Sequence, residues 1–382
     1  MEAAIQLSLS DTLVVDGDVH VHETPRALAP HCEMPWRRAL EAIQDVPERY
    51  LDLPGFSPGE SAGGYQAQFP TSSGSPPRVV ATRDQMREEL SALAIDIGVL
   101  FPDHLLKLPV LTQTDYAAAL ARAYNRWLVA EWVDEDVGLL GAIVACPQAP
   151  DTTVLEINTY AGLAGVVGVY LPCAGIDPLW GHRRYDAIYD AAESAGLPVL
   201  LHSATVTHPV FPFNNHGFDT ELARHALSHP FSIMANLTSM VTTGVPVRFP
   251  GLRVGVFEAG ISWVPFLMNR LDKEYIVGQR REVPFLVELP SHYLRTFHYA
   301  TQPIEEPRRP GDFAALVELY DGEDTTMFAS DWPHSDFDSP TKLAQMPMSS
   351  ALRANILGAN AMRFFDIRSL PGALGESDRG QN

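Results

Sequence analysis

The chain has 382 residues, of which 46% are hydrophobic and 19% are charged, and these proportions allow a large buried core in one domain that carries insertions. The formal net charge of −20 argues against a phosphate-binding surface, because association with nucleic acid depends on clustered Lys and Arg. An anionic substrate would be repelled at long range, so a local cation must draw it in.

The cysteines and the first residues of the chain indicate which cellular compartment to expect. Cys32, Cys146 and Cys173 are an odd number without close pairing, which is typical of a reducing compartment and not of a disulfide framework. The first residues, MEAAIQLSLSD, lack the basic start and long apolar core of a secretion signal. The sequence has no run of about 18 apolar residues, the length that spans a membrane. We therefore expect a soluble, cytoplasmic protein with neither a membrane nor a nucleic-acid partner.

Short apolar runs alternate with segments of helical periodicity, which is typical of a parallel sheet with crossover helices. The predicted strands are Thr12 to Val19, Ala94 to Leu100, Val137 to Ala145, Gly165 to Leu171, Leu197 to His202, Leu252 to Glu258, Thr296 to Thr301 and Thr326 to Asp331. The predicted helices are Asp115 to Val133, Pro150 to Leu163, Tyr185 to Gly196, Thr220 to Thr243, Ser262 to Val277 and Arg309 to Asp321. This alternation predicts an α/β protein with a (β/α)8 TIM barrel.

Residues 25–80 interrupt the alternation after the first strand. Within them, residues 53–77 are rich in Pro, Gly and Ser, as in SPGESAGG and PTSSGSPP, and are predicted to form a loop. Loops that follow barrel strands border the active site, so we interpret residues 25–80 as a lid or substrate-binding insertion, with a disordered surface excursion as the alternative. Residues 368–382 are expected to form a flexible tail, which leaves 1–367 as a single barrel domain.

Ligand-type side chains follow three of the predicted strands. His20 and His22 lie two positions apart in DGDVHVHETP, so both point to the same face of an extended segment. His202 ends the run LPVLLH, and Asp331 ends the run MFASD. Nitrogen and carboxylate ligands from the ends of several strands can surround one ion at the mouth of a barrel. The sequence therefore predicts a metal site formed by His20, His22, His202 and Asp331.

Each of these residues also has a plain structural interpretation. An isolated His-x-His pair recurs by chance, His202 could simply terminate a strand, and Asp331 could cap a helix. Asp18 lies two residues before His20 and replaces His22 as a ligand if the register of the strand shifts by two. The joint occurrence of such residues after the first, fifth and eighth strands favours the metal site.

Five segments together resemble the amidohydrolase superfamily, and within it the amidohydrolase-related group that includes aminocarboxymuconate-semialdehyde, dihydroxybenzoate and resorcylate decarboxylases. The resemblance covers nearly the whole chain and implies a distorted (β/α)8 barrel. It also implies a zinc ion, with manganese as the alternative, and metal ligands at His20, His22, His202 and Asp331. The segments are DGDVHVHETP, GVVGVYLPCAGIDPLWGHRRYDAIYDAAESAGLPVLLHSA, HPFSIMANLTSMVTTGVPVRFPGLRVGVFEAGISWVPFLMNRLDKEY, FASDWPHSD and ILGANAMRFF.

The sequence departs from the family pattern after the sixth strand. Many members have a His there that activates water or moves a proton, whereas this chain has VFEAG with Glu258. A partly desolvated carboxylate near a metal has a pKa suited to proton transfer, so we predict that Glu258 takes this role; a salt bridge with Arg253 or Arg270 is the alternative. His229 is the second candidate, and a helix-start His held by backbone partners is its alternative. With Asp331, these two are the predicted catalytic residues.

The resemblance leaves two reactions open. In a decarboxylase the metal holds a polar group of the substrate beside the leaving CO2, and an acid protonates the carbon. In a hydrolase the metal lowers the pKa of bound water, and Asp331 accepts its proton. The characterised relatives favour nonoxidative decarboxylation of an aromatic or unsaturated carboxylic acid, and hydrolysis of an amide or lactone is the second hypothesis. A catalytically inactive barrel that acts as a binding protein is the third. We expect a small-molecule carboxylic acid as substrate and a homodimer as the assembly.

Overall fold

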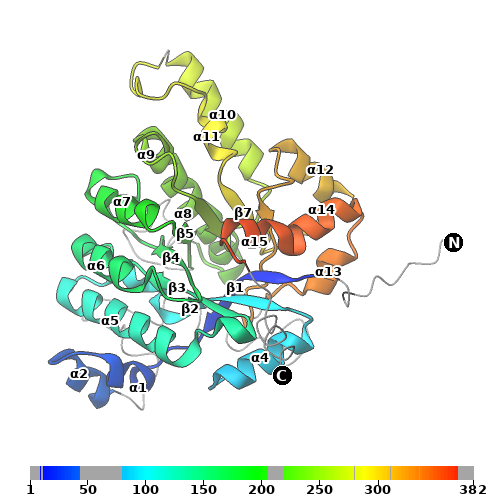
Figure 1. Ribbon diagram of the computed structural model, residues 1–382. Helices are drawn as coiled ribbons and strands as arrows, with labels where there is room; N and C mark the ends of the chain where they lie inside the picture. The colour runs from blue at the N-terminus through cyan, green and yellow to red at the C-terminus, as the bar shows by residue number, and fades with distance from the viewer. Residues whose placement is uncertain are drawn as a thin grey trace, which may run out of the picture.

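Eight parallel strands form a single sheet in the order of the chain, with helices around it (Figure 1). A computed structural model describes residue 9 and residues 12–43, 80–204, 218–278, 280–309, 311–334 and 336–368. Each observed strand overlaps a predicted one, so the predicted (β/α)8 barrel is confirmed. The strands are β1 (Val15–Val21), β2 (Ile97–Pro102), β3 (Leu139–Val144), β4 (Val166–Pro172), β5 (Val199–His202), β6 (Val254–Phe257), β7 (His298–Ala300) and β8 (Thr326–Met327).

The composition of the strands explains their position in the molecule. The sequences LLGAIV of β3 and VLLH of β5 are buried at every residue, as expected for strands covered by helices on one side and by the barrel interior on the other. Apolar side chains suit such a pleated and enclosed surface. These strands therefore hold their carboxyl ends, where the polar residues follow, in fixed positions at one mouth of the barrel.

The barrel closes between β1 and the segment that follows β8. The N–H of Gly17 donates to the carbonyl of Phe328 over 3.0 Å, and the N–H of His20 donates to the carbonyl of Trp332 over 2.8 Å. An isolated parallel bridge joins Val19 to Trp332. These bonds bring the residues after β8 directly beside the polar end of β1.

Helices surround the strands on the outside (Figure 1). The six predicted helices are observed with slightly different ends, and the first of them continues as a π-helical turn over Leu128–Trp132. No helix in the described part of the chain is both long and apolar enough to cross a membrane. The six are α5 (Thr114–Trp127), α6 (Pro150–Tyr160), α7 (Asp186–Ser194), α8 (Glu221–Thr242), α10 (Val264–Val277) and α12 (Asp312–Leu319).

The sequence analysis did not predict the remaining helices. Where residues 25–80 are described, they form short helices, and the predicted loop over 53–77 and the tail after 368 lie outside the described residues. These helices are α1 (Pro25–Leu28), α2 (Trp36–Ala42), α4 (Arg83–Ala92), α9 (Val245–Arg248), α11 (Pro290–Leu294), α13 (Pro340–Ala344), α14 (Ser350–Ala354) and α15 (Asn360–Phe364). Turns of 3₁₀ or π helix cover Ala29–His31, His104–Val110 (η5), Glu135–Val137, Arg183–Tyr185 and Asn355–Ala359.

Gly181 offers a test of how tightly α8 packs on the barrel. A Cβ at this position would lie 2.3 Å from the backbone carbonyl group of Ser239, which cannot move away as a side chain can. We expect Gly181→Ala to lower the free energy of unfolding by about 1–3 kcal/mol, the usual cost of overpacking, as measured by chemical denaturation. Gly162→Ala is the matched control, because a Cβ there meets nothing within 4 Å. Equal stability of the two variants would contradict the close packing.

Candidate metal centre

Five polar side chains meet at the carboxyl ends of the strands. Asp18 and His20 lie in β1, His202 ends β5, Glu258 follows β6 and Asp331 follows β8. Each of these residues is at most 5% exposed. Ionisable groups this deep in a protein need partners, because burial without compensation costs several kcal/mol per charge.

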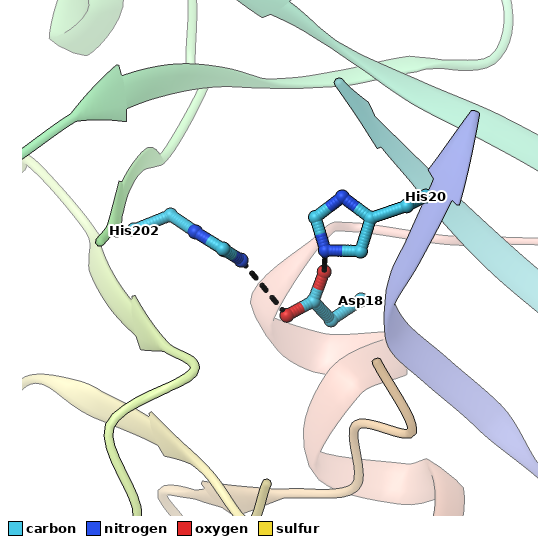
Figure 2. A group of neighbouring side chains, drawn as sticks. All are labelled: Asp18, His20 and His202. Carbon is cyan, nitrogen blue, oxygen red and sulfur yellow. Dashed lines mark hydrogen bonds and ion pairs between the residues drawn. The ribbon is translucent and has the colours of Figure 1, made fainter. Parts of the chain in front are cut away.

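Asp18 lies between the two histidines (Figure 2). One carboxylate oxygen, Oδ1, is 3.2 Å from Nε2 of His20, and the other, Oδ2, is 3.2 Å from Nε2 of His202. Burial acts to raise the pKa of Asp18, but the neighbouring His202 and His20 outweigh it and hold the pKa well below its ordinary value. Asp18 is therefore ionised at neutral pH and presents two oxygens to two ring nitrogens.

The outer nitrogens of both rings are fixed by backbone carbonyls. Nδ1 of His20 donates to the carbonyl of Pro102 over 2.6 Å, and Nδ1 of His202 donates to the carbonyl of Ser203 over 2.7 Å. A carbonyl only accepts hydrogen bonds, so Nδ1 of each ring carries a proton and Nε2 is the nitrogen directed at the carboxylates. Metal-binding histidines are typically oriented in this way by their second nitrogen.

Asp331 joins the group from the segment that follows β8. Its Oδ1 lies 3.0 Å from Nε2 of His20, and its Oδ2 accepts a hydrogen bond of 3.3 Å from the side chain of Gln302. The backbone of Asp331 has a φ of 62°, in the left-handed region, and its N–H donates to the carbonyl of Asp18. The residue is thus held in an unfavourable backbone conformation that directs its carboxylate into the barrel mouth.

Glu258 also has a left-handed backbone conformation, with a φ of 49°. Its Oε2 lies 3.3 Å from Nε2 of His202, and its Oε1 lies 3.2 Å from Nδ1 of His229. Burial, followed by the negative charge of Asp331, raises the pKa of Glu258 to about 8. The predicted salt-bridge alternative is not observed, because Arg253 binds the carbonyl of Phe364 and Arg270 binds Glu274.

His229 lies within α8 and not at a helix start, which corrects the alternative considered for it. Its Nδ1 also lies 3.1 Å from the carbonyl of Glu258. Burial lowers its pKa, which favours a neutral ring. The structure therefore brings His229 into contact with Glu258, while its catalytic role stays a prediction.

An aromatic layer lies against the polar group. The ring of Phe101 is 6.4 Å from that of His20 and 5.7 Å from that of His202, and it also contacts Tyr170 and Phe257. All three aromatic residues are fully buried. An apolar floor of this kind excludes water and strengthens every electrostatic interaction above it.

The donor set fits a divalent metal ion. Asp18 Oδ1, His20 Nε2 and Glu258 Oε2 are buried and make no hydrogen bond with any residue that the structure describes. Asp18 Oδ1 and Asp331 Oδ1 both lie against Nε2 of His20, an arrangement that needs either a proton on Nε2 or a cation between the three atoms. Imidazole nitrogens with carboxylate oxygens are ligands for zinc and manganese.

His22 does not lie in this group, although the sequence analysis placed it among the ligands. Its side chain is 25% exposed, and its Nδ1 lies 2.7 Å from Oδ2 of Asp103. Asp18, which the sequence analysis considered as the alternative ligand, contacts His20 and His202 instead. The ligand role of His22 stays a prediction, while the geometry favours Asp18, His20, His202 and Asp331.

Two residues of the site were missed in the sequence. His334 has its Nδ1 2.7 Å from Oδ1 of Asp331 and its Nε2 3.4 Å from Oδ1 of Asp103. Burial acts to lower the pKa of His334, but Asp331 and Asp103 outweigh it and raise the pKa well above its ordinary value. The available signals were that His334 lies three residues after Asp331 and that Asp103 directly follows the apolar run of β2.

The fold and this group of side chains define a barrel enzyme whose reactive groups lie at the carboxyl ends of its strands. The family model described as Amidohydrolase matches residues 18–367, and the chain belongs to this amidohydrolase family. None of the curated proteins matches the sequence.

Solved structures of the same fold include an amidohydrolase and two decarboxylases. The amidohydrolase, from Mycobacterium avium subsp. paratuberculosis K-10, is 19% identical, covers 93% of this chain and 99% of its own, and has a TM-score of 0.73. The 5-carboxyvanillate decarboxylase from Novosphingobium aromaticivorans DSM 12444, complexed with manganese and 4-hydroxy-3-methoxy-5-nitrobenzoic acid, is 16% identical over 96% and 100% of the chains, with a TM-score of 0.65. The 2,6-dihydroxybenzoate decarboxylase from Rhizobium is 16% identical over 93% and 99%, with a TM-score of 0.65. At these identities the likeness shows the fold.

Proposed function

We propose that this protein is a divalent-metal-dependent enzyme that decarboxylates a small aromatic or unsaturated carboxylic acid without oxidation. One observation carries the proposal: Nε2 of His20 faces the ionised carboxylates of Asp18 and Asp331 at 3.2 and 3.0 Å in a buried centre. Without a metal these contacts need a proton on Nε2, in keeping with the raised pKa of His20, and a divalent ion bound there would replace that proton. The choice of reaction is supported by the two decarboxylases that share the fold, one of which is complexed with manganese.

The proposed ligands are Asp18, His20, His202 and Asp331, and the proposed ion is manganese or zinc. A bound divalent ion would supply Lewis-acid polarisation and a positive charge for the oxygen atoms of the substrate. Asp331 keeps its second oxygen on Gln302, which fixes the angle of the carboxylate. The positive charge also gives an anionic substrate a local attraction in a protein whose net charge is −20.

Glu258 is the proposed proton donor. In the reaction the bond between the carboxylate and the substrate carbon breaks, its electron pair stays on that carbon, and a proton replaces the CO2 that leaves. Glu258 is oriented for such a transfer because His229 contacts one of its oxygens and His202 the other. The next proton must enter from solvent, so one proton is consumed for each CO2 released.

Release of CO2 tests this function directly. The manganese-loaded protein is incubated with hydroxybenzoic acids and with unsaturated dicarboxylic acids, and CO2 and product are quantified. In D2O the product should carry one deuterium on the carbon that lost the carboxyl group. Removal of the metal with a chelator should abolish turnover, and added manganese should restore it. Metal-dependent hydrolysis without CO2 release would reject the decarboxylase proposal.

Hydrolysis of an amide or lactone is the second candidate, and the pair of carboxylates favours it. Asp331 and Glu258 both border the centre, and Asp331, whose pKa the neighbouring His334 holds below its ordinary value against the effect of burial, could accept a proton from an attacking water. Lactones and amides incubated with the metal-loaded protein distinguish the two, because hydrolysis incorporates one oxygen atom of labelled water into the product acid.

The ligand assignment at β1 can be tested by two substitutions. Asp18→Asn removes a negative charge that contacts both His20 and His202, whereas His22→Gln changes a partly exposed ring outside this group. We expect the loss of turnover in Asp18→Asn to exceed that in His22→Gln by at least about tenfold, the lower range for metal-site substitutions. The reverse order, measured at saturating manganese, would restore His22 as the ligand.

A further inference from the structure

A lysine at the edge of the barrel mouth has no partner of opposite charge. Lys107 belongs to η5, the segment that follows β2 at the carboxyl ends of the strands. Its side chain is partly buried and makes no hydrogen bond or ion pair with any residue that the structure describes. The other buried or partly buried Lys and Arg residues of the described chain all contact an acidic side chain or a backbone carbonyl. Lys107 therefore differs from every cation of similar burial.

The fold fixes the backbone from which this lysine extends. The buried carboxylate of Glu23, just after β1, accepts the backbone N–H of Asp103 over 3.0 Å and that of Leu105 over 2.7 Å. These bonds hold the start of η5 against the end of β1. A 3₁₀ helix has about three residues per turn, so His104 and Lys107 lie on the same face of η5. The neighbouring leucines of η5 are buried, which anchors the segment to the core.

The ammonium group of Lys107 lies among the polar residues of the mouth. Burial lowers the pKa of Lys107, against the effect of the negative charge on Asp103. Burial also lowers the pKa of His104 to about 4, and the positive charge of Lys107 acts in the same direction. Asp103 contacts His334, which in turn contacts Asp331 of the buried centre. The lysine thus lies within electrostatic range of a chain of contacts that leads to the proposed metal ion.

We propose that Lys107 binds a carboxylate group of the substrate, an inference that rests on the proposed function because it takes the substrate to be a carboxylic acid. A partly buried ammonium group without a partner is costly, and an anion that enters the mouth would offset this cost. Asp103 does not serve as that partner, because each of its oxygens already contacts an imidazole nitrogen. In a protein with a net charge of −20, Lys107 supplies local attraction for an anion at the entrance to the centre.

This contact would make the site selective for acids over uncharged compounds of the same shape. A lysine ammonium is a compact charge with three donors on a flexible stem, so it can follow carboxylates on substrates of different size. Hydrogen bonds between charged partners are roughly twice as strong as those between neutral groups. An acid should therefore bind more tightly than its amide, and Lys107 should account for much of the difference.

Binding measurements test this role without turnover. The manganese-loaded protein is titrated by calorimetry with benzoate and trans-cinnamate, and with benzamide and cinnamamide as uncharged analogues. We expect Lys107→Met to weaken binding of the two acids by at least about tenfold and to leave binding of the amides unchanged, because only an anion gains from the ammonium group. Lys107→Arg, which keeps the positive charge, should retain most of the affinity for the acids.

Lys273→Met is the matched control, since it removes the same charge from an exposed position of α10. It should bind the acids as the wild type does, which separates a local contact from the change in net charge. Equal affinity of the wild type and Lys107→Met for the acids would overturn the proposal, as would a wild type that binds acids no more tightly than amides. Thermal unfolding checks the fold of each variant, and Lys107→Gln takes the place of Lys107→Met should the latter not fold.

The same titrations separate this proposal from the proposed function. Loss of acid binding in Lys107→Met, in a protein that releases no CO2 from any acid, would keep Lys107 as a binding residue and reject only the decarboxylase. Release of CO2 by the wild type together with unchanged acid binding in Lys107→Met would keep the decarboxylase and reject the role of Lys107.

Discussion

Replacing His202 with alanine is expected to remove the ion of the buried centre and to lower turnover by roughly a thousandfold or more. The ring of His202 contacts both Asp18 and Glu258, and its Nδ1 is fixed by the carbonyl of Ser203. Loss of the ring would leave two buried carboxylates without their shared partner. Charge stabilisation by a metal is worth several kcal/mol, and about 4 kcal/mol corresponds to roughly a thousandfold in rate.

Metal content and turnover should be measured on the same preparation of His202→Ala. Elemental analysis should find one ion fewer per chain than in the wild type, and added manganese should not restore turnover at concentrations that saturate the wild type. His292→Ala is the matched control, since this exposed histidine lies on α11, away from the strand ends. Full metal content together with full turnover in His202→Ala would move the metal site away from β5.

The barrel was predictable because its signal is local. Each parallel strand is a short apolar run that is buried on both faces, and such a run can be recognised without knowledge of its neighbours. β8 is an instructive exception, since residues Thr326 to Asp331 were predicted as a strand but only Thr326–Met327 pair with β7. Beyond Met327 the chain instead bonds to β1, as the contact of Gly17 with Phe328 shows. A contact between residues more than 300 positions apart leaves no local pattern.

The sequence analysis did not predict α4, because few apolar residues mark this helix. In the sequence RDQMREELSA only Met86 and Leu90 are buried, four residues apart, and most of the other residues are charged or polar. A single pair at that spacing is compatible with a helix but does not predict one. Thr82 caps the helix by accepting the N–H of Gln85, a signal that was present in the sequence and was not used.

The sequence analysis placed His20, His202 and Asp331 in the buried centre but chose His22 in place of Asp18. The two-residue repeat of a strand explains this difference. Asp16, Asp18 and His20 alternate along β1 and His22 follows its end, so the alternation in the sequence places all four on one face but cannot tell which pair lies at the depth of His202. That depth follows from the closure of the barrel, in which the carbonyl of Asp18 accepts the N–H of Asp331. Asp103 was unpredictable for a related reason, since it reaches the site only through the pairing of β1 with β2.

Replacing Glu258 with glutamine is expected to slow turnover by at least about a hundredfold while the protein keeps its fold and its metal. The amide has nearly the same shape as the carboxyl group, so the contacts with His202 and His229 on either side can largely persist. An amide cannot give up a proton as a carboxylic acid can, and general acid–base catalysis by one group contributes at least about a hundredfold. The expected loss therefore lies in the rate constant and not in metal binding.

Glu156→Gln is the matched control for Glu258→Gln, because it also converts a buried acid to an amide. Glu156 lies on α6 and accepts a hydrogen bond from Asn125 over 3.0 Å, away from the group at the strand ends. We expect this control to keep turnover, whereas Glu258→Gln loses it at unchanged metal content. In D2O the residual product of Glu258→Gln should still carry deuterium, because water can replace the donor slowly. Unchanged turnover in Glu258→Gln would reduce Glu258 to a structural partner of His202 and leave Asp331 as the group that handles the proton.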